Sequence, residues 1–72
     1  ISATYGTERS EINVTDQYSR RVINDKLDVT VSNELAEGDP DPGVPKTLRI
    51  RYKQRTTEHE RTFREGSRIQ LP

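Results

Sequence analysis

The chain has 72 residues, of which 28% are hydrophobic and 33% charged, and it contains no Cys, Met or Trp. The absence of Cys excludes disulfides, and with His59 as the only histidine it argues against a zinc site. The length allows one small domain over residues 1–72, and no apolar run approaches the roughly 20 residues of a membrane helix.

The formal net charge is zero, but the charges are distributed unevenly along the chain. Residues 1–45 contain nine acidic and four basic residues, whereas residues 46–72 contain three acidic and eight basic residues, which leaves −5 and +5. Unless the two parts interleave, opposite charges on one molecule favour head-to-tail association that weakens as salt rises.

Alternation of apolar and polar residues predicts β-strands along most of the chain, because successive side chains of a strand point to opposite faces of a sheet. The expected strands cover residues 1–5, 12–14, 27–32, 47–53 and 57 or 58 to 64, with a closing strand at 69–71. The pattern is typical of a mostly β fold, a small antiparallel sandwich of about six strands with one short helix.

The one helix is expected after the second strand. Thr15 has the hydroxyl of a good N-cap, and Asp16 suits the positive end of a helix dipole. We predict a helix of about two turns that runs to about Asn24, because Asn24-Asp25 tolerate the left-handed conformation that ends a helix. Its expected buried face consists of Tyr18, Val22 and Ile23.

A long loop is predicted over residues 33–46. Its centre is the turn sequence Gly38, Asp39, Pro40, Asp41, Pro42 and Gly43, followed by Pro45. The prolines remove backbone donors and fix φ, which stiffens the segment. The carboxylates of Glu37, Asp39 and Asp41 could offer oxygens to calcium, but their spacing lacks the order of an EF-hand, and a rigid turn explains the same residues.

The fourth and fifth strands are expected to form a hairpin closed by Arg55-Thr56. In that register paired residues sum to 111, so that Lys53 faces Glu58, Arg51 faces Glu60 and Leu48 faces Phe63. The register also pairs Tyr52 with His59 and Ile50 with Arg61. The inner face of the hairpin therefore becomes more polar toward its tip.

Three further places in the sequence were considered as functional sites. Lys46, Arg49, Arg51, Lys53 and Arg55 form a basic strand like those that bind nucleic acid, but Glu58 and Glu60 should neutralise part of it. His59 lacks a paired nucleophile, so catalysis is not expected. Asn13-Val14-Thr15 is a possible glycosylation sequence. We expect no cofactor, no nucleic acid and no small-molecule ligand.

Several short motifs resemble one known family. They are Ala3-Thr4-Tyr5-Gly6, Val14-Thr15-Asp16, Val31-Ser32-Asn33, Gly38-Asp39-Pro40 with Pro42-Gly43, Lys46 with Leu48 and Tyr52, Glu65-Gly66, and Ile69 to Pro72. The likeness is to the C-terminal domain of unknown function of a mitochondrial DnaJ-like protein, with similar domains in fungal and bacterial proteins. It implies a non-enzymatic accessory or assembly domain. Related chains tend to have Asn-Gly where this chain has Arg55-Thr56, so a longer loop at the hairpin tip is the alternative.

These observations predict a structural and interaction module that assembles with copies of itself. A domain of this size buries only roughly 60% of the surface that its unfolded chain exposes, so partners are a natural source of added stability. Pairing of a terminal strand with the next subunit's open edge would give a filament. The residues expected at the contacts are Ile1, Ala3, Tyr5, Arg49, Arg51, Lys53, Ile69 and Leu71.

The alternative function is an accessory binding domain that recognises a carbohydrate or protein ligand through the 33–46 loop. Glycan-binding sites usually contain exposed aromatic side chains, and this chain has few, which argues against a carbohydrate ligand. The chain begins at Ile1 rather than Met, which we interpret as a processed product or part of a longer chain. A composition without Cys is compatible with several compartments; we expect an extracellular setting, with the mitochondrion as the alternative that the resemblance implies.

Overall fold

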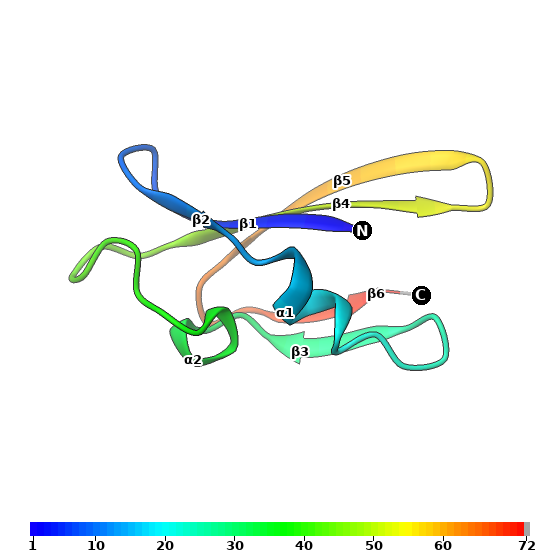
Figure 1. Cartoon of the computed structure of the whole chain (residues 1–72), viewed down its shortest axis with the longest axis horizontal. Coiled ribbons are helices and arrows are strands. Elements are labelled where there is room, and N and C mark those ends of the chain that lie inside the picture. Colours follow the sequence, from blue (N-terminus) through cyan, green and yellow to red (C-terminus); the bar gives the residue numbers. More distant parts are fainter. Residues whose placement is uncertain (72) are drawn as a thin grey trace.

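A computed structural model describes residues 1–71 and shows a mostly β protein with two antiparallel sheets (Figure 1). In chain order the elements are β1 (Ser2–Gly6), β2 (Glu11–Asn13), α1 (Thr15–Ser19), β3 (Leu27–Thr30), α2 (Asn33–Ala36), β4 (Thr47–Gln54), β5 (Thr57–Arg64) and β6 (Arg68–Leu71). The predicted antiparallel β fold with about six strands is confirmed. The predicted single helix is wrong, because the structure contains two short ones.

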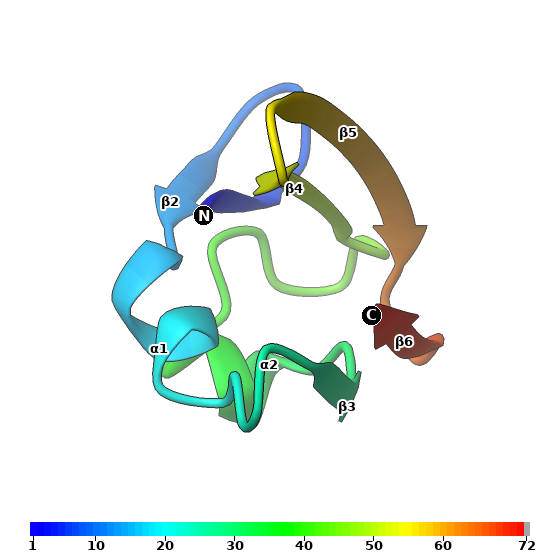
Figure 2. The same ribbon diagram turned by 90° about the vertical axis from the view of Figure 1, so that its right-hand side faces the viewer.

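The larger sheet has the strand order β2-β1-β4-β5, and the smaller sheet pairs β3 with β6. Viewed end-on, the larger sheet forms one side of the molecule, and β3, β6 and the helices form the other (Figure 2). The core between them is built from both sides: Tyr5, Leu48 and Ile50 meet Tyr18 and Ile69, all of them fully buried. The layers therefore share one hydrophobic core.

The predicted register of the β4–β5 hairpin is confirmed along its whole length, including Lys53 with Glu58 and Leu48 with Phe63. Arg55 adopts a left-handed conformation with φ 60°, so the two-residue turn forms, and the alternative of a longer loop at the hairpin tip is wrong. The polar tip is confirmed as well. The Tyr52 and His59 rings stack with centroids 5.3 Å apart, and both side chains are half-buried.

The helix prediction is wrong in length and capping. α1 ends at Ser19, and Val22 and Ile23 are 37% and 70% exposed rather than packed on the sheet. The left-handed Asn24-Asp25 pair instead forms a tight turn, closed by two backbone hydrogen bonds between Ile23 and Lys26. A turn that reverses the chain toward β3 prevails over the helical spacing of two apolar residues.

The N-terminus of α1 is held differently from the prediction. Thr15 is the first residue of the helix, and its hydroxyl bonds to the backbone of Ala3 in β1 instead of capping. The side chain of Asn13 accepts the Thr15 N–H at 2.9 Å. The hydroxyl therefore fastens α1 to the sheet, which a reading of the local sequence could not show.

The predicted loop 33–46 begins with α2, which is a correction. Ser32 is the N-cap, and its hydroxyl accepts the Leu35 N–H at 3.1 Å. The helix ends at Ala36 and is capped by Glu37, which has φ 62°, and the remaining segment runs to β4 without regular structure. The third strand is correspondingly shorter than predicted and ends at Thr30.

Candidate functional site

Two candidate sites lie at opposite ends of a molecule that measures 37 × 19 × 18 Å. The segment 37–46 and the β1–β2 turn occupy one end of the long axis, and the β4–β5 tip and the turn before β3 occupy the other (Figure 1). We call the first the loop end and the second the groove end.

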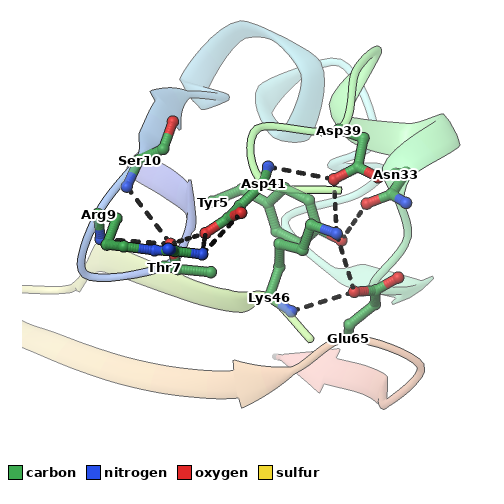
Figure 3. A network of polar contacts seen from close by, with 9 residues as sticks. All are labelled: Tyr5, Thr7, Arg9, Ser10, Asn33, Asp39, Asp41, Lys46 and Glu65. Carbon is green, nitrogen blue, oxygen red and sulfur yellow. Dashed lines mark hydrogen bonds and ion pairs between the residues drawn. The ribbon is translucent and has the colours of Figure 1, made fainter. Parts of the chain in front are cut away.

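The loop end is built around a buried lysine (Figure 3). Lys46 is only 3% exposed, and its Nζ lies 2.5 Å from Asp39 and 4.0 Å from Glu65. The backbone of Lys46 is also bound to Glu65, because its N–H donates to the Glu65 carboxylate and its carbonyl accepts the Glu65 N–H. Lys46 therefore ties the loop to the start of β4 and to the turn after β5.

Asp41 fixes the other side of the loop. Its carboxylate accepts a hydrogen bond of 2.7 Å from the Thr7 hydroxyl and two from the Arg9 guanidinium, both residues of the β1–β2 turn. The Thr7 hydrogen bond, followed by the Arg9 contacts, lowers the pKa of Asp41 below its usual value. Asp39 and Asp41 are thus engaged by the chain itself, which favours the rigid turn over the calcium site.

Two tyrosines are buried in the core, and Tyr5 is also part of this network. Tyr5 donates a hydrogen bond of 2.8 Å to Asn33, whereas the Tyr18 hydroxyl is buried and has no hydrogen-bond partner among the described residues. Burial, and then the charge of Glu65, raises the pKa of Tyr5 to about 12. Burial alone raises the pKa of Tyr18 to about 12.

The raised tyrosine pKa values predict a loss of stability in alkali. An unfolded chain releases the phenolic protons near pH 10.0 and the folded chain only near pH 12. The folded state therefore holds more protons in this window, and its stability falls as pH rises from about 10 to about 12. We expect the steepness of this fall, measured by urea unfolding at successive pH values, to shrink in a Tyr5→Phe/Tyr18→Phe variant. An equal slope in both proteins would contradict the assignment.

The groove end is an open hollow of about 500 Å³ between the two layers. Ile1, Val22, residues 25–27, residues 52–55 and Leu71 line it. Ile1 is 46% exposed and Val22 is 37% exposed, so apolar surface is accessible there. Of its four charged side chains three are basic, namely Lys26, Lys53 and Arg55, against Asp25. The groove can therefore take an apolar segment that carries negative charge.

The residues predicted at assembly contacts are only partly brought together. Ile1, Lys53 and Leu71 meet in the groove. Ala3, Tyr5 and Ile69 are buried in the core. Both terminal strands pair within the chain, since β1 lies between β2 and β4, and β6 lies against β3. Any exchange of a terminal strand would therefore require it to leave its own sheet.

The other two predicted contact residues, Arg49 and Arg51, lie on the exposed face of β4. Arg49 approaches Glu60 at 3.6 Å, and Arg51 approaches Glu60 at 3.4 Å and Glu58 at 3.8 Å. The acidic residues of β5 thus neutralise this part of the basic strand.

The remaining candidate residues are His59 and Asn13. The hydrogen bonds of residues 1–71 include none from a hydroxyl to His59, and no group of three metal-ligating residues was found there. Asn13 is exposed at the end of β2 and holds the start of α1. No helix among these residues is long and apolar enough to cross a membrane.

Sequence reasoning missed Lys26 and Val22 as groove residues and the burial of Lys46. The sequence predicts Val22 on the buried face of a helix and places Lys26 in no element, and only the turn at Asn24-Asp25 brings both to the groove. Comparison with protein-family models, curated proteins and solved structures found no match for the chain. The resemblance to the DnaJ-like C-terminal domain therefore stays a prediction.

Proposed function

We propose that this chain is a non-catalytic structural and interaction module that assembles with copies of itself, head to tail, into a filament. The observation that carries the proposal is the charge at the two ends of the long axis. The β1–β2 turn, the segment 37–46 and the turn after β5 hold five carboxylates and two cations: Glu8, Glu37, Asp39, Asp41 and Glu65 against Arg9 and Lys46. Arg20, after α1, also pairs with Glu37 at 3.3 Å, so the balance at this end is −2. The groove holds three cations and one carboxylate, which leaves +2.

Shape supports the same contact. The loop end is stiff, because Lys46 and Asp41 anchor it, and it presents Pro40, Pro42 and Val44 beside its carboxylates. The groove offers exposed apolar surface between basic side chains. The loop end and the groove lie at opposite ends of one chain. Each added subunit therefore leaves one of these surfaces free, and the contact propagates as an open filament.

The two terminal strands contribute to the proposed contact only through their outermost residues, because Ile1 and Leu71 line the groove. The stronger form of terminal-strand pairing, in which β6 leaves β3 and pairs with the next subunit, would remove Ile69 and Leu71 from the core. A Cys pair at Asp28 and Gln70, which face each other across β3 and β6, distinguishes the two forms. Oxidised protein should still assemble by the head-to-tail contact but not by strand exchange.

Charge reversal tests the head-to-tail contact. We expect a groove variant (Lys26→Glu/Lys53→Glu) and a loop variant (Glu8→Lys/Glu37→Lys) each to stay small in sedimentation velocity at low salt, where the wild type forms large species. An equimolar mixture should assemble again, because each reversed surface then finds an opposite one. Screening should dissolve both assemblies as the Debye length falls from about 10 Å at 0.1 M to about 3 Å at 1 M salt.

The control for this test is Lys26→Arg/Lys53→Arg, which keeps the charge and should assemble like the wild type. A wild type that remains monomeric at high concentration and low salt would refute the proposal. Electron micrographs of the assembled wild type then show whether the contact closes into rings or extends into filaments.

The second candidate, recognition of a protein or carbohydrate ligand by the 33–46 loop, is favoured by the stiffness of the loop. Thr7 and Arg9 hold Asp41, and Lys46 holds Asp39, so the loop is ordered before any partner arrives. Most of its carboxylate oxygens near the core are already engaged by the chain. The assembly proposal needs only the exposed charge of the loop end, and for that reason we place it first.

A further inference from the structure

The free edge of β5 points to a second contact between copies of this chain, independent of the head-to-tail one. β5 is the last strand of the larger sheet, and no strand within residues 1–71 pairs with its outer edge. Its inner face is only partly covered: His59 and Phe63 are half-buried, and Arg61 is exposed with its guanidinium 5.8 Å from the Phe63 ring centre. An eight-residue edge of this kind is a template for another strand.

The hydrogen-bonding phase of β5 shows which backbone groups face outward. The Glu65 N–H donates to Lys46 at 2.8 Å and so continues the β4–β5 ladder by one pair. Because such bonds recur at every second residue of an antiparallel pair, Glu58, Glu60, Thr62 and Arg64 present their N–H and C=O groups to the outer edge. The Arg64 carbonyl already accepts the Ser67 N–H, so the outward pattern is fully open up to Thr62.

We propose that β5 pairs antiparallel with β5 of a second copy, about a two-fold axis that passes through Thr62. In this register the numbers of two paired residues sum to 124. Glu60 faces Arg64 of the other copy on the outer face, and Arg61 faces Phe63 on the inner face. The two-fold axis makes each of these contacts twice, and only Thr62 faces itself.

Neighbouring registers are less complementary. A sum of 122 places Arg61 against Arg61, and a sum of 120 places Glu60 against Glu60, which sets like charges side by side. A sum of 126 leaves only residues 62–64 of β5 in the overlap, compared with residues 60–64 in the proposed register. Like charges therefore disfavour the sums of 122 and 120, and the short overlap disfavours the sum of 126, which leaves the sum of 124 for self-pairing.

The result is one continuous eight-stranded sheet across two copies. This contact is isologous and closed, so by itself it stops at a dimer. It goes beyond the proposed function, because it uses neither the groove nor the loop end. Where both contacts form, it joins head-to-tail filaments in pairs.

The test uses the Lys26→Glu/Lys53→Glu background, in which the head-to-tail contact is reversed, so that failure of either proposal is seen separately. In sedimentation equilibrium we expect dimers in this background. Thr62→Glu should weaken the dimer by about 10-fold or more, because two carboxylates meet on the axis, while Thr62→Val should leave it intact. Within one chain the introduced carboxylate would face Arg49, the partner of Thr62 in β4, so Thr62→Glu should fold normally.

Cross-linking supplies a second readout. The chain has no Cys, so the thiol introduced by Thr62→Cys can form a disulfide only with the same residue of a second copy. Oxidation should give covalent dimers much faster for Thr62→Cys than for Thr57→Cys, which lies outside the overlap. A monomeric background protein, equal dimerisation of Thr62→Glu and Thr62→Val, or equal cross-linking at the two positions would overturn the proposal.

Discussion

Replacing Gly6 with alanine is expected to destabilise the protein by at least about 3 kcal/mol, out of a total of roughly 4–11 kcal/mol for a domain of this size. Gly6 has φ +154°, and a Cβ there would overlap the Ser10 carbonyl oxygen and lie 2.5 Å from the Glu11 Cα. Both are backbone atoms, which cannot move without opening the β1–β2 pairing. Gly6 also pairs with Thr47 of β4, so the distortion reaches the centre of the sheet.

Gly38→Ala is the matched control. A Cβ at Gly38 meets nothing within 4 Å, and its φ is not positive. Its replacement should therefore be neutral or stabilise by about 0.4–1 kcal/mol, through a less flexible unfolded chain. Urea unfolding followed by circular dichroism gives both values. Similar midpoints for the two variants would show that the close approach at Gly6 does not matter.

Lys46→Met should cost about 2–3 kcal/mol. Removing one partner of a fully buried ion pair costs roughly 3–5 kcal/mol, because the other charge loses its compensation. Here Asp39 and Glu65 are 34% and 31% exposed, so water recovers part of their solvation and the expected loss is smaller. Met is a matched replacement, since it keeps the length of the buried side chain while removing the ammonium group.

A double variant separates the ion pair from packing. Asp39→Asn in the Lys46→Met background removes a carboxylate that no longer has a cation beside it. The two changes should together cost less than the sum of their single effects, by about 1 kcal/mol or more. Strict additivity, measured as free energies of urea unfolding, would show that Lys46 acts by its volume alone.

Local patterns predicted the β4–β5 hairpin in full. The strands, the turn at Arg55-Thr56 and every paired residue follow from apolar alternation and from opposite charges that face each other. These interactions connect residues that are close in the chain, so few alternatives compete with them. The partly polar inner face near Tyr52 followed from the same register.

Local patterns failed where two local preferences were similar in strength. Val22 and Ile23 had helical spacing behind Tyr18, yet Asn24-Asp25 form a tight turn and leave Ile23 exposed. Ser32 was expected at the end of a strand, but it caps α2, a helix within the predicted loop. Helices this short gain little from propensity, so packing against the rest of the molecule decides them.

The amino-acid sequence by itself determined the fold class, the six strands and the uneven charge, because alternation and charge are properties of the chain. Only the tertiary structure decided the strand order, with β1 inside the larger sheet and β6 on β3, since those pairings join distant segments at a cost in loop entropy. The pairing of these distant segments also buried Lys46, formed the groove beside Ile1 and left the outer edge of β5 unpaired among the described residues. These features arise from contacts between segments that no local pattern brings together.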